Sequence, residues 1–216
     1  MLLSRDPSVL IVIALIFIVC LPFHEFSHAL AAFRLGDNTA RLMGRLTLNP
    51  LAHIDPMGAL MILAVGFGWA KPTPYNPYNI RYGRNGEAII AFAGPASNLV
   101  LATAAAIPLR YIVTTRMDVP PILEGTLSFF VLFNLALMAF NLIPIPPLDG
   151  SKILFALLDP QTERQYRPVI EQYGPFLLLL VVFSSYVGGP SLIGSLYDSV
   201  VGPLYSFLVG IPSPFV

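Results

Sequence analysis

The sequence predicts an all-α polytopic membrane protein, and two observations lead to that fold class. Of the 216 residues, 56% are hydrophobic and only 11% are charged, and the mean hydropathy of +0.73 is well above that of a soluble domain. Several apolar stretches are also long enough to span a bilayer, because a hydrocarbon core of about 30 Å requires roughly 20 residues of helix. We therefore expect a helical bundle of four to six transmembrane segments.

Four stretches meet this length requirement, and they are residues 9–33, 88–109, 125–148 and 174 to about 197. Glu25 in the first is the only formally charged residue among them. A signal peptide competes for the first stretch, since ALAA at 29–32 loosely resembles a cleavage site. The stretch is longer than a signal-peptide core, and the residues before it are barely basic. Both observations favour a retained span.

The remaining segments predict shorter or irregular structure. Residues 56–70 contain three glycines and are short for a crossing, so a re-entrant segment or hairpin is expected near 56–79. Three prolines in KPTPYNPYN, residues 71–79, exclude helix and favour extended backbone. Mixed charges in 150–173 are typical of a solvated connection, and the path of 191–216 stays open. We expect residues 1–216 to form a single membrane-embedded domain.

The charge balance and cysteine content restrict the partners. Twelve Lys and Arg balance twelve Asp and Glu, so no basic field favours nucleic acid. Cys20 is the only cysteine, which excludes an intramolecular disulfide. The lipid bilayer is the expected partner, and a homo-oligomer is compatible with the sequence.

Residues 24–28 read HEFSH inside the first apolar stretch. On a helix, His24 and His28 point the same way, so both imidazoles can reach one metal ion, and Glu25 projects close enough to act on water beside that ion. Ionisable groups in a membrane segment are costly and normally mark function. The pattern therefore predicts a zinc hydrolase site and disfavours a chance match.

A catalytic zinc ion usually takes three protein ligands. The candidates for the third are Cys20, His53, Asp55 and Asp149. Cys20 is disfavoured, because Cys20, His24 and His28 together span about 12 Å of helix rise. Asp149 is better placed, since the prolines of NLIPIPPLDG let its carboxylate turn inward. His53 is expected near the site without an assigned role.

Three motifs in this order resemble the signature elements of the site-2 protease family of intramembrane zinc metalloproteases. They are HExxH, FAGPASN at 92–98 and NLIPIPPLDG at 141–150. The resemblance covers residues from about 9 to 158 and is closest to the compact prokaryotic type without a PDZ domain. It implies one Zn²⁺ per chain, and cleavage of peptide bonds within or near the transmembrane segments of membrane proteins, as in regulated intramembrane proteolysis.

The resemblance also implies roles for individual residues. His24, His28 and Asp149 would be the metal ligands, and Glu25 the catalytic acid and base. Asn98 and Asn141 match positions that line the active site, where they would bind substrate or the oxyanion. Ordinary hydrogen bonding between helices is the competing reading of both asparagines.

Two other functions remain open at this point. A membrane zinc transporter would also place His and Asp in the bilayer, although it would need polar groups along a whole conduction path. A non-catalytic membrane scaffold would have no use for Glu25. The extended segment 71–79 could pair with an unwound substrate by strand addition.

A topology argument places the site in the membrane. If His24, Asn98 and Asp149 meet at one depth, the first and third spans run in one direction and the second runs opposite. Nine Lys and Arg then lie on the side of the 34–87 connection and three on the other, against seven and five if 56–70 crossed fully. The positive-inside rule makes the richer side cytoplasmic. We expect a multi-pass protein of the cell (inner) membrane with its active site nearer the cytoplasm.

Overall fold

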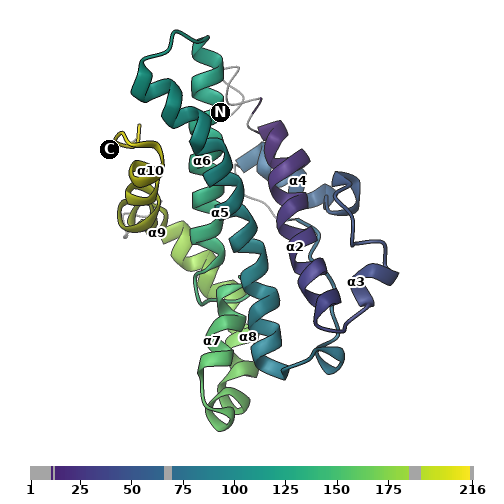
Figure 1. The fold of residues 1–216 in the computed structure, drawn as a ribbon. Coiled ribbons are helices and arrows are strands. Elements are labelled where there is room, and N and C mark those ends of the chain that lie inside the picture. The colour runs from purple at the N-terminus through teal and green to yellow at the C-terminus, as the bar shows by residue number, and fades with distance from the viewer. Residues whose placement is uncertain (1–10, 12, 66–69, 185–190, 215–216) are drawn as a thin grey trace.

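The computed structural model describes residues 11, 13–65, 70–184 and 191–214. Within these ranges every regular element is a helix, which confirms the all-α prediction (Figure 1). Among the described residues, four helices are long and apolar enough to cross a membrane, namely Ile13–Arg34, Gly83–Thr115, Pro121–Asn141 and Leu192–Val209. The chain is therefore built as a membrane protein.

The described helices follow one another along the chain in this order. The α-helices are α2 (Leu21–Arg34), α3 (Thr39–Leu42), α4 (Pro56–Val65), α5 (Gly83–Thr115), α6 (Pro121–Asn141), α7 (Gly150–Leu157), α8 (Pro160–Phe183), α9 (Leu192–Leu196) and α10 (Gly202–Val209). Two π-helical turns, η1 (Ile16–Cys20) and η5 (Tyr197–Val201), precede α2 and α10. Two 3₁₀ turns, η2 (Pro50–Ala52) and η3 (Pro77–Asn79), lie in the connection between α2 and α5.

The first three spans lie where the sequence predicts them, with one shorter than expected. Helix α6 ends at Asn141 rather than near 148, because the prolines that follow cannot continue a helix. Helix α4 has ten residues, too few to span. The rest of the expected re-entrant segment, 66–69, lies outside the described residues.

The C-terminal third differs from the prediction. The segment 150–173, expected as a solvated connection, forms α7 and most of α8, and its Asp159, Arg164 and Glu171 are exposed. Helix α8 begins where the Asp159 side chain accepts hydrogen bonds from two backbone amides. The span expected from 174 to about 197 does not form as one helix. Ser191 caps a new helix that begins at Leu192, so the fourth candidate span lies later, at Leu192–Val209.

Helix α5 occupies the middle of the bundle, between α2 and α6 (Figure 1). The connection from α2 to α5 starts and finishes at the same end of the bundle, because the Arg81 amide donates to the Leu35 carbonyl at 2.9 Å. Helices α2 and α6 therefore run in one direction and α5 in the other, as the topology argument required (Figure 1).

Small side chains let α5 approach its neighbours closely. Toward its C-terminus it packs with α6, η5 and α10 around one apolar cluster. The buried members are Ala102, Ala106, Leu109, Val131, Leu132, Leu135, Met138, Ala139, Val201, Tyr205 and Val209.

An ion-pair network joins the N-terminus of α5 to α8. The Arg167 guanidinium bonds to Glu87 on α5 at 2.9 Å, and to Glu163 and Glu171 on its own helix at 3.0 and 2.9 Å. Burial alone would lower the pKa of Arg167, but these carboxylates raise it above its ordinary value. The network fixes α8 beside the turn that leads to Asp149.

Candidate metal centre

Helix α2 carries the predicted His, Glu and His residues on its buried face. His24, Glu25 and His28 are only 5%, 8% and 7% exposed. Their spacing brings the two Nε2 atoms to 3.0 Å from each other, with the imidazole rings nearly perpendicular. Among the residues that the structure describes, these three form a group whose ligand atoms lie within 4.8 Å of one another.

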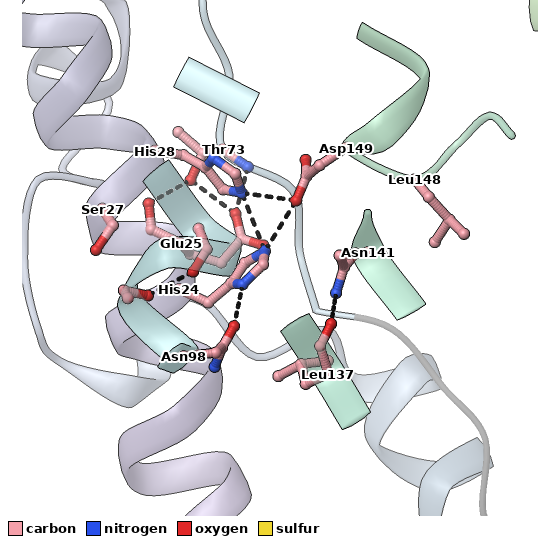
Figure 2. Close-up of polar contacts among 12 residues, drawn as sticks. His24, Glu25, Ser27, His28, Thr73, Asn98, Leu137, Asn141, Leu148 and Asp149 are labelled. Carbon is pink, nitrogen blue, oxygen red and sulfur yellow. Dashed lines mark hydrogen bonds and ion pairs between the residues drawn. The ribbon is translucent and has the colours of Figure 1, made fainter. Parts of the chain in front are cut away.

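Helix α5 orients both imidazoles (Figure 2). His24 Nδ1 donates to Asn98 Oδ1 and His28 Nδ1 donates to the Ile90 carbonyl oxygen, each at 2.7 Å. Because these oxygens only accept, the hydrogen of each neutral imidazole lies on Nδ1. Each Nε2 therefore presents a lone pair, which is the form that binds a metal ion.

The turn after α6 brings Asp149 to the same place. Asp149 occupies the N-cap position of α7, but its side chain caps no backbone amide. Instead, Oδ2 lies 3.2 Å from His24 Nε2 and 3.3 Å from His28 Nε2. A side chain at position 150 would place its Cβ 2.2 Å from the Leu142 carbonyl oxygen, so the turn requires Gly150.

The three facing atoms are all acceptors. Asp149 Oδ2 is buried and has no hydrogen-bond donor, and it faces two nitrogen lone pairs. A zinc ion in tetrahedral coordination, with bonds of about 2.0–2.2 Å, sets its ligand atoms roughly 3.3 Å apart. The observed separations of 3.0, 3.2 and 3.3 Å fit this arrangement. The residues present therefore suit a zinc ion with three protein ligands.

Gly94, in the FAGPASN motif, permits this packing. A Cβ at position 94 would lie 2.4 Å from His28 Nε2 and 2.7 Å from His24 Cε1. Only a residue without a side chain lets α5 approach the two imidazoles this closely. The glycine of the motif is therefore a requirement of the candidate metal centre itself.

Thr73 holds the carboxylate of Glu25 (Figure 2). Its backbone amide and its hydroxyl both donate to Glu25 Oε2, at 2.8 and 2.7 Å. Thr73 belongs to residues 71–79, called here the proline strap. Pro72 and Pro74 have no amide hydrogen, so Thr73 supplies the one backbone donor of this tripeptide.

The first end of the proline strap is anchored by buried groups. The Lys71 amide donates to the His53 carbonyl oxygen at 2.8 Å. The buried Arg45 guanidinium donates to the carbonyl oxygens of Ala52 and, at 3.3 Å, of Pro72. These contacts hold Thr73 against Glu25.

Asp37, which is fully buried, anchors the other end of the strap. Its carboxylate accepts from the Asn76 amide at 2.9 Å, from Asn79 Nδ2 at 3.1 Å and from the Thr39 hydroxyl at 2.7 Å. Burial alone would raise the pKa of Asp37, but these donors lower it below the ordinary carboxyl value.

The side-chain amides of two remaining predicted residues, Asn98 and Asn141, donate hydrogen bonds to other residues. Asn98 is completely buried, and its Nδ2 donates to Asn134 Oδ1 at 3.1 Å while its oxygen faces His24. Asn141 Nδ2 donates to the Leu137 carbonyl of its own helix at 2.9 Å. Substrate-binding and oxyanion roles for both asparagines stay predictions, and Asn98 orients a candidate ligand.

The other candidate third ligands have different surroundings. His53 is buried, and its Nε2 donates to the Thr47 carbonyl at 2.7 Å. Its connection to the site is the backbone bond to the proline strap. Asp55 accepts from the Gly58 amide at 2.8 Å, and Cys20 Sγ accepts from Asn134 Nδ2 at 3.3 Å.

Sequence reasoning missed Thr73 and the reason for Gly94. No signal near the HExxH motif identifies Thr73, which lies 48 residues from Glu25 along the chain. The signal for Gly94 was a glycine within a membrane helix, where close approach of another element is the usual cause.

Comparison with known proteins agrees with this site. The sequence pattern of Peptidase family M50 matches residues 116–182, which include Asn141 and Asp149. YwhC of Bacillus subtilis is 38% identical over 201 residues, covering 87% of this chain and 91% of YwhC. Rip2 of Mycolicibacterium smegmatis is 34% identical over 182 residues, covering 81% of this chain and 66% of Rip2.

The names of both relatives describe them, provisionally, as zinc metalloproteases. No solved structure matches this chain. The match with YwhC extends over nearly all of both proteins. The chain belongs to peptidase family M50, the family of the site-2 proteases.

Proposed function

We propose that this protein is an intramembrane zinc metalloprotease that binds one Zn²⁺ through His24, His28 and Asp149. The main support is the meeting of three buried acceptor atoms, with no hydrogen between them, beside the carboxylate of Glu25. When bound, zinc would polarise both a water molecule and the scissile carbonyl. The substrates would be membrane proteins, cleaved within or near their transmembrane segments.

Glu25 would move the protons of the reaction. It would take one proton as a water O–H bond breaks and the oxygen attacks the peptide carbonyl. It would return that proton to the amine nitrogen as the C–N bond breaks. Both donors of Thr73 bond to Oε2, so Oε1 would be the oxygen that accepts and returns the proton.

The location of α2 sets the form of the substrate. His24 and His28 lie inside a helix that can cross a membrane, whereas the carbonyls of a transmembrane substrate are already paired within its own helix. The substrate would therefore have to unwind locally. If it pairs with the proline strap, it would meet mainly carbonyl oxygens, because the Thr73 and Asn76 amides already have partners.

The proposed location is the cell (inner) membrane, with the site nearer the cytoplasm. Support comes from the excess of Lys and Arg in the connections at that end of the bundle. The ends of α2 and α5 meet there through Leu35 and Arg81. A cysteine introduced at exposed Leu42 should react with a membrane-impermeant thiol reagent only after the cytoplasmic face is opened.

The deciding experiment substitutes the proposed catalytic residue while keeping its shape. Glu25→Gln, purified and returned to vesicles, should retain zinc near one ion per chain and should lose cleavage of a model transmembrane peptide. Wild-type protein gives the reference, and His24→Ala should lose both zinc and cleavage. Unchanged cleavage by Glu25→Gln would exclude the proposed mechanism, in which Glu25 transfers the protons. Zinc movement into the vesicles would favour a transporter instead.

A further inference from the structure

A chain of buried amides leads from the candidate metal centre into the core of the bundle. Asn98 on α5 accepts from His24 and donates through Nδ2 to Asn134 Oδ1 on α6 at 3.1 Å. Asn134 Nδ2 donates in turn to the Phe130 carbonyl at 2.9 Å and to Cys20 Sγ at 3.3 Å. Asn98, Asn134 and Cys20 are all 0% exposed.

The donor-to-acceptor direction of these hydrogen bonds is fixed by the contact between Asn134 and Phe130. A backbone carbonyl only accepts, so the bond to Phe130 requires that Asn134 point its NH₂ group there and its oxygen toward Asn98. That oxygen selects the amide orientation of Asn98 in which Nδ2 faces Asn134 and Oδ1 faces His24. Each link determines the orientation of the next.

The orientation of Asn98 determines which nitrogen of His24 carries the hydrogen. If the Asn98 amide turned over, its NH₂ group would face His24 Nδ1, and that nitrogen would have to become the acceptor. The hydrogen of the neutral imidazole would then lie on Nε2, between the ring and Asp149 Oδ2. His24 would lose the lone pair that it offers to a metal ion.

We propose that Asn134 is a positioning residue for the zinc centre, acting through Asn98 to keep the Nε2 lone pair of His24 available. This inference rests on the proposed function. A buried asparagine in a membrane helix would also be explained by helix–helix hydrogen bonding alone. The two roles differ in their effect on metal affinity.

The test measures metal affinity directly, with zinc and with cobalt(II) as a spectroscopic probe. Asn134→Leu removes all three hydrogen bonds of the amide and should raise the zinc dissociation constant by about 10- to 100-fold, the usual effect of losing an outer partner of a metal ligand. The visible spectrum of the cobalt form should change as well. Asn134→Ala serves as a second variant if Asn134→Leu does not fold.

Ser128→Ala provides the matched control on the same helix. Ser128 shares a 2.8 Å hydrogen bond with the Tyr205 hydroxyl, which lies in the apolar cluster and has no link to His24. This variant should lose a comparable bond between helices and keep the wild-type zinc affinity and cobalt spectrum.

A double-mutant cycle separates positioning from a structural role. If Asn134 acts through Asn98, adding Asn134→Leu to Asn98→Ala should weaken zinc binding no further. Additive losses, or zinc binding by both Asn134 variants within about twofold of wild type, would overturn the inference. Wild type that binds zinc and cleaves substrate would leave the proposed function intact in that case. Wild type that binds no zinc would overturn both.

Discussion

The two halves of helix α5 are packed by different means. Toward its N-terminus, α5 meets α2 through directed contacts, namely the Ile90 carbonyl, the bare backbone of Gly94 and the Asn98 amide. Toward its C-terminus, Ala102, Ala106 and Leu109 meet α6 and α10 mainly through apolar packing, with Arg110 donating to α10 backbone carbonyls at the end of the helix. Hydrogen bonds fix angle and register, whereas apolar packing responds mainly to volume. The N-terminal half of α5 therefore determines the geometry of the candidate metal centre, and the C-terminal half contributes to the packing of the helical bundle.

The largest effect is expected from removing Asp149, the residue at the N-cap of α7 that faces the two imidazoles beside the polar half of α5. Asp149→Ala deletes one of the three proposed ligands, so zinc affinity should fall on the order of a thousandfold, as measured by metal analysis of the purified protein. Asp159→Ala is the control, because Asp159 only caps α8. It should cost about 1 kcal/mol of stability and keep zinc. Retained zinc in Asp149→Ala would redirect the third-ligand assignment to His53.

A single methyl group at Gly94 should be nearly as damaging. Gly94→Ala places a Cβ 2.4 Å from His28 Nε2, and the ring cannot move without losing its bond to Ile90. Zinc affinity should fall about a hundredfold, because outer contacts that orient ligands carry effects of this size. Competition with a metal chelator would measure it, and wild-type affinity in Gly94→Ala would refute the close packing.

A substitution of the opposite kind in the apolar half of α5 tests whether the two halves have different roles. Ala106→Gly removes a methyl group from the same helix and should cost about 1–2 kcal/mol of stability through lost packing and helix propensity. Its zinc affinity should equal that of wild type. Thermal unfolding in detergent, followed beside the chelator assay, checks both statements.

Much of the fold followed from the sequence, because the bilayer admits few structures and hydropathy marks their positions. The spacing of His24 and His28 fixed their shared face, and the prolines after Asn141 indicated where Asp149 would turn inward. The charges of α8 predict a solvated connection, and Arg164 and Glu171 are exposed. They did not indicate that the segment is helical or that Arg167 docks it on Glu87.

The supporting contacts of the site could not be predicted in the same way. Thr73 reaches Glu25, and Asn134 reaches Asn98, across long separations in sequence. Such pairs follow from the packing of whole helices, which no local pattern encodes. The HExxH motif indicates which side chains are candidate metal ligands, whereas the tertiary fold determines which other groups orient them.

The hydroxyl of Thr73 should contribute less than a ligand does. Thr73→Val keeps the shape and the backbone amide but removes one of two donors to Glu25 Oε2. We expect kcat to fall about tenfold with zinc content unchanged, and Thr73→Ser to restore it. Steady-state kinetics on a transmembrane peptide would show this. Equal kcat for wild type and Thr73→Val would show that the Thr73 hydroxyl does not contribute to positioning Glu25.

The smallest expected effect is a pH-dependent change in stability at Asp37. The pKa of this carboxyl is lowered in the folded protein, so its stabilisation is present above the unfolded pKa of about 3.9 and is lost as the pH falls through the folded pKa. Asp37→Asn should therefore be less stable at neutral pH by about 1 kcal/mol. The difference should shrink below about pH 4.

Thermal unfolding across this pH range measures the Asp37 effect. Val131→Ala, in the apolar half of the bundle, is the reference because no titrating group is involved. Its loss of stability should be the same at each pH. If the loss of stability in Asp37→Asn stayed constant with pH, this result would contradict the assigned role of the carboxylate.

The separation of the three proposed ligands along the chain has a consequence for biosynthesis. His24 and His28 leave the ribosome early, and the α5 groups that orient them follow. Asp149 emerges only after α6 has been made, so zinc capture would be a late event in the life of the nascent chain. A partly inserted protein would then be unable to cut its neighbours in the translocation machinery, and proteolytic competence would arrive together with completed helix insertion.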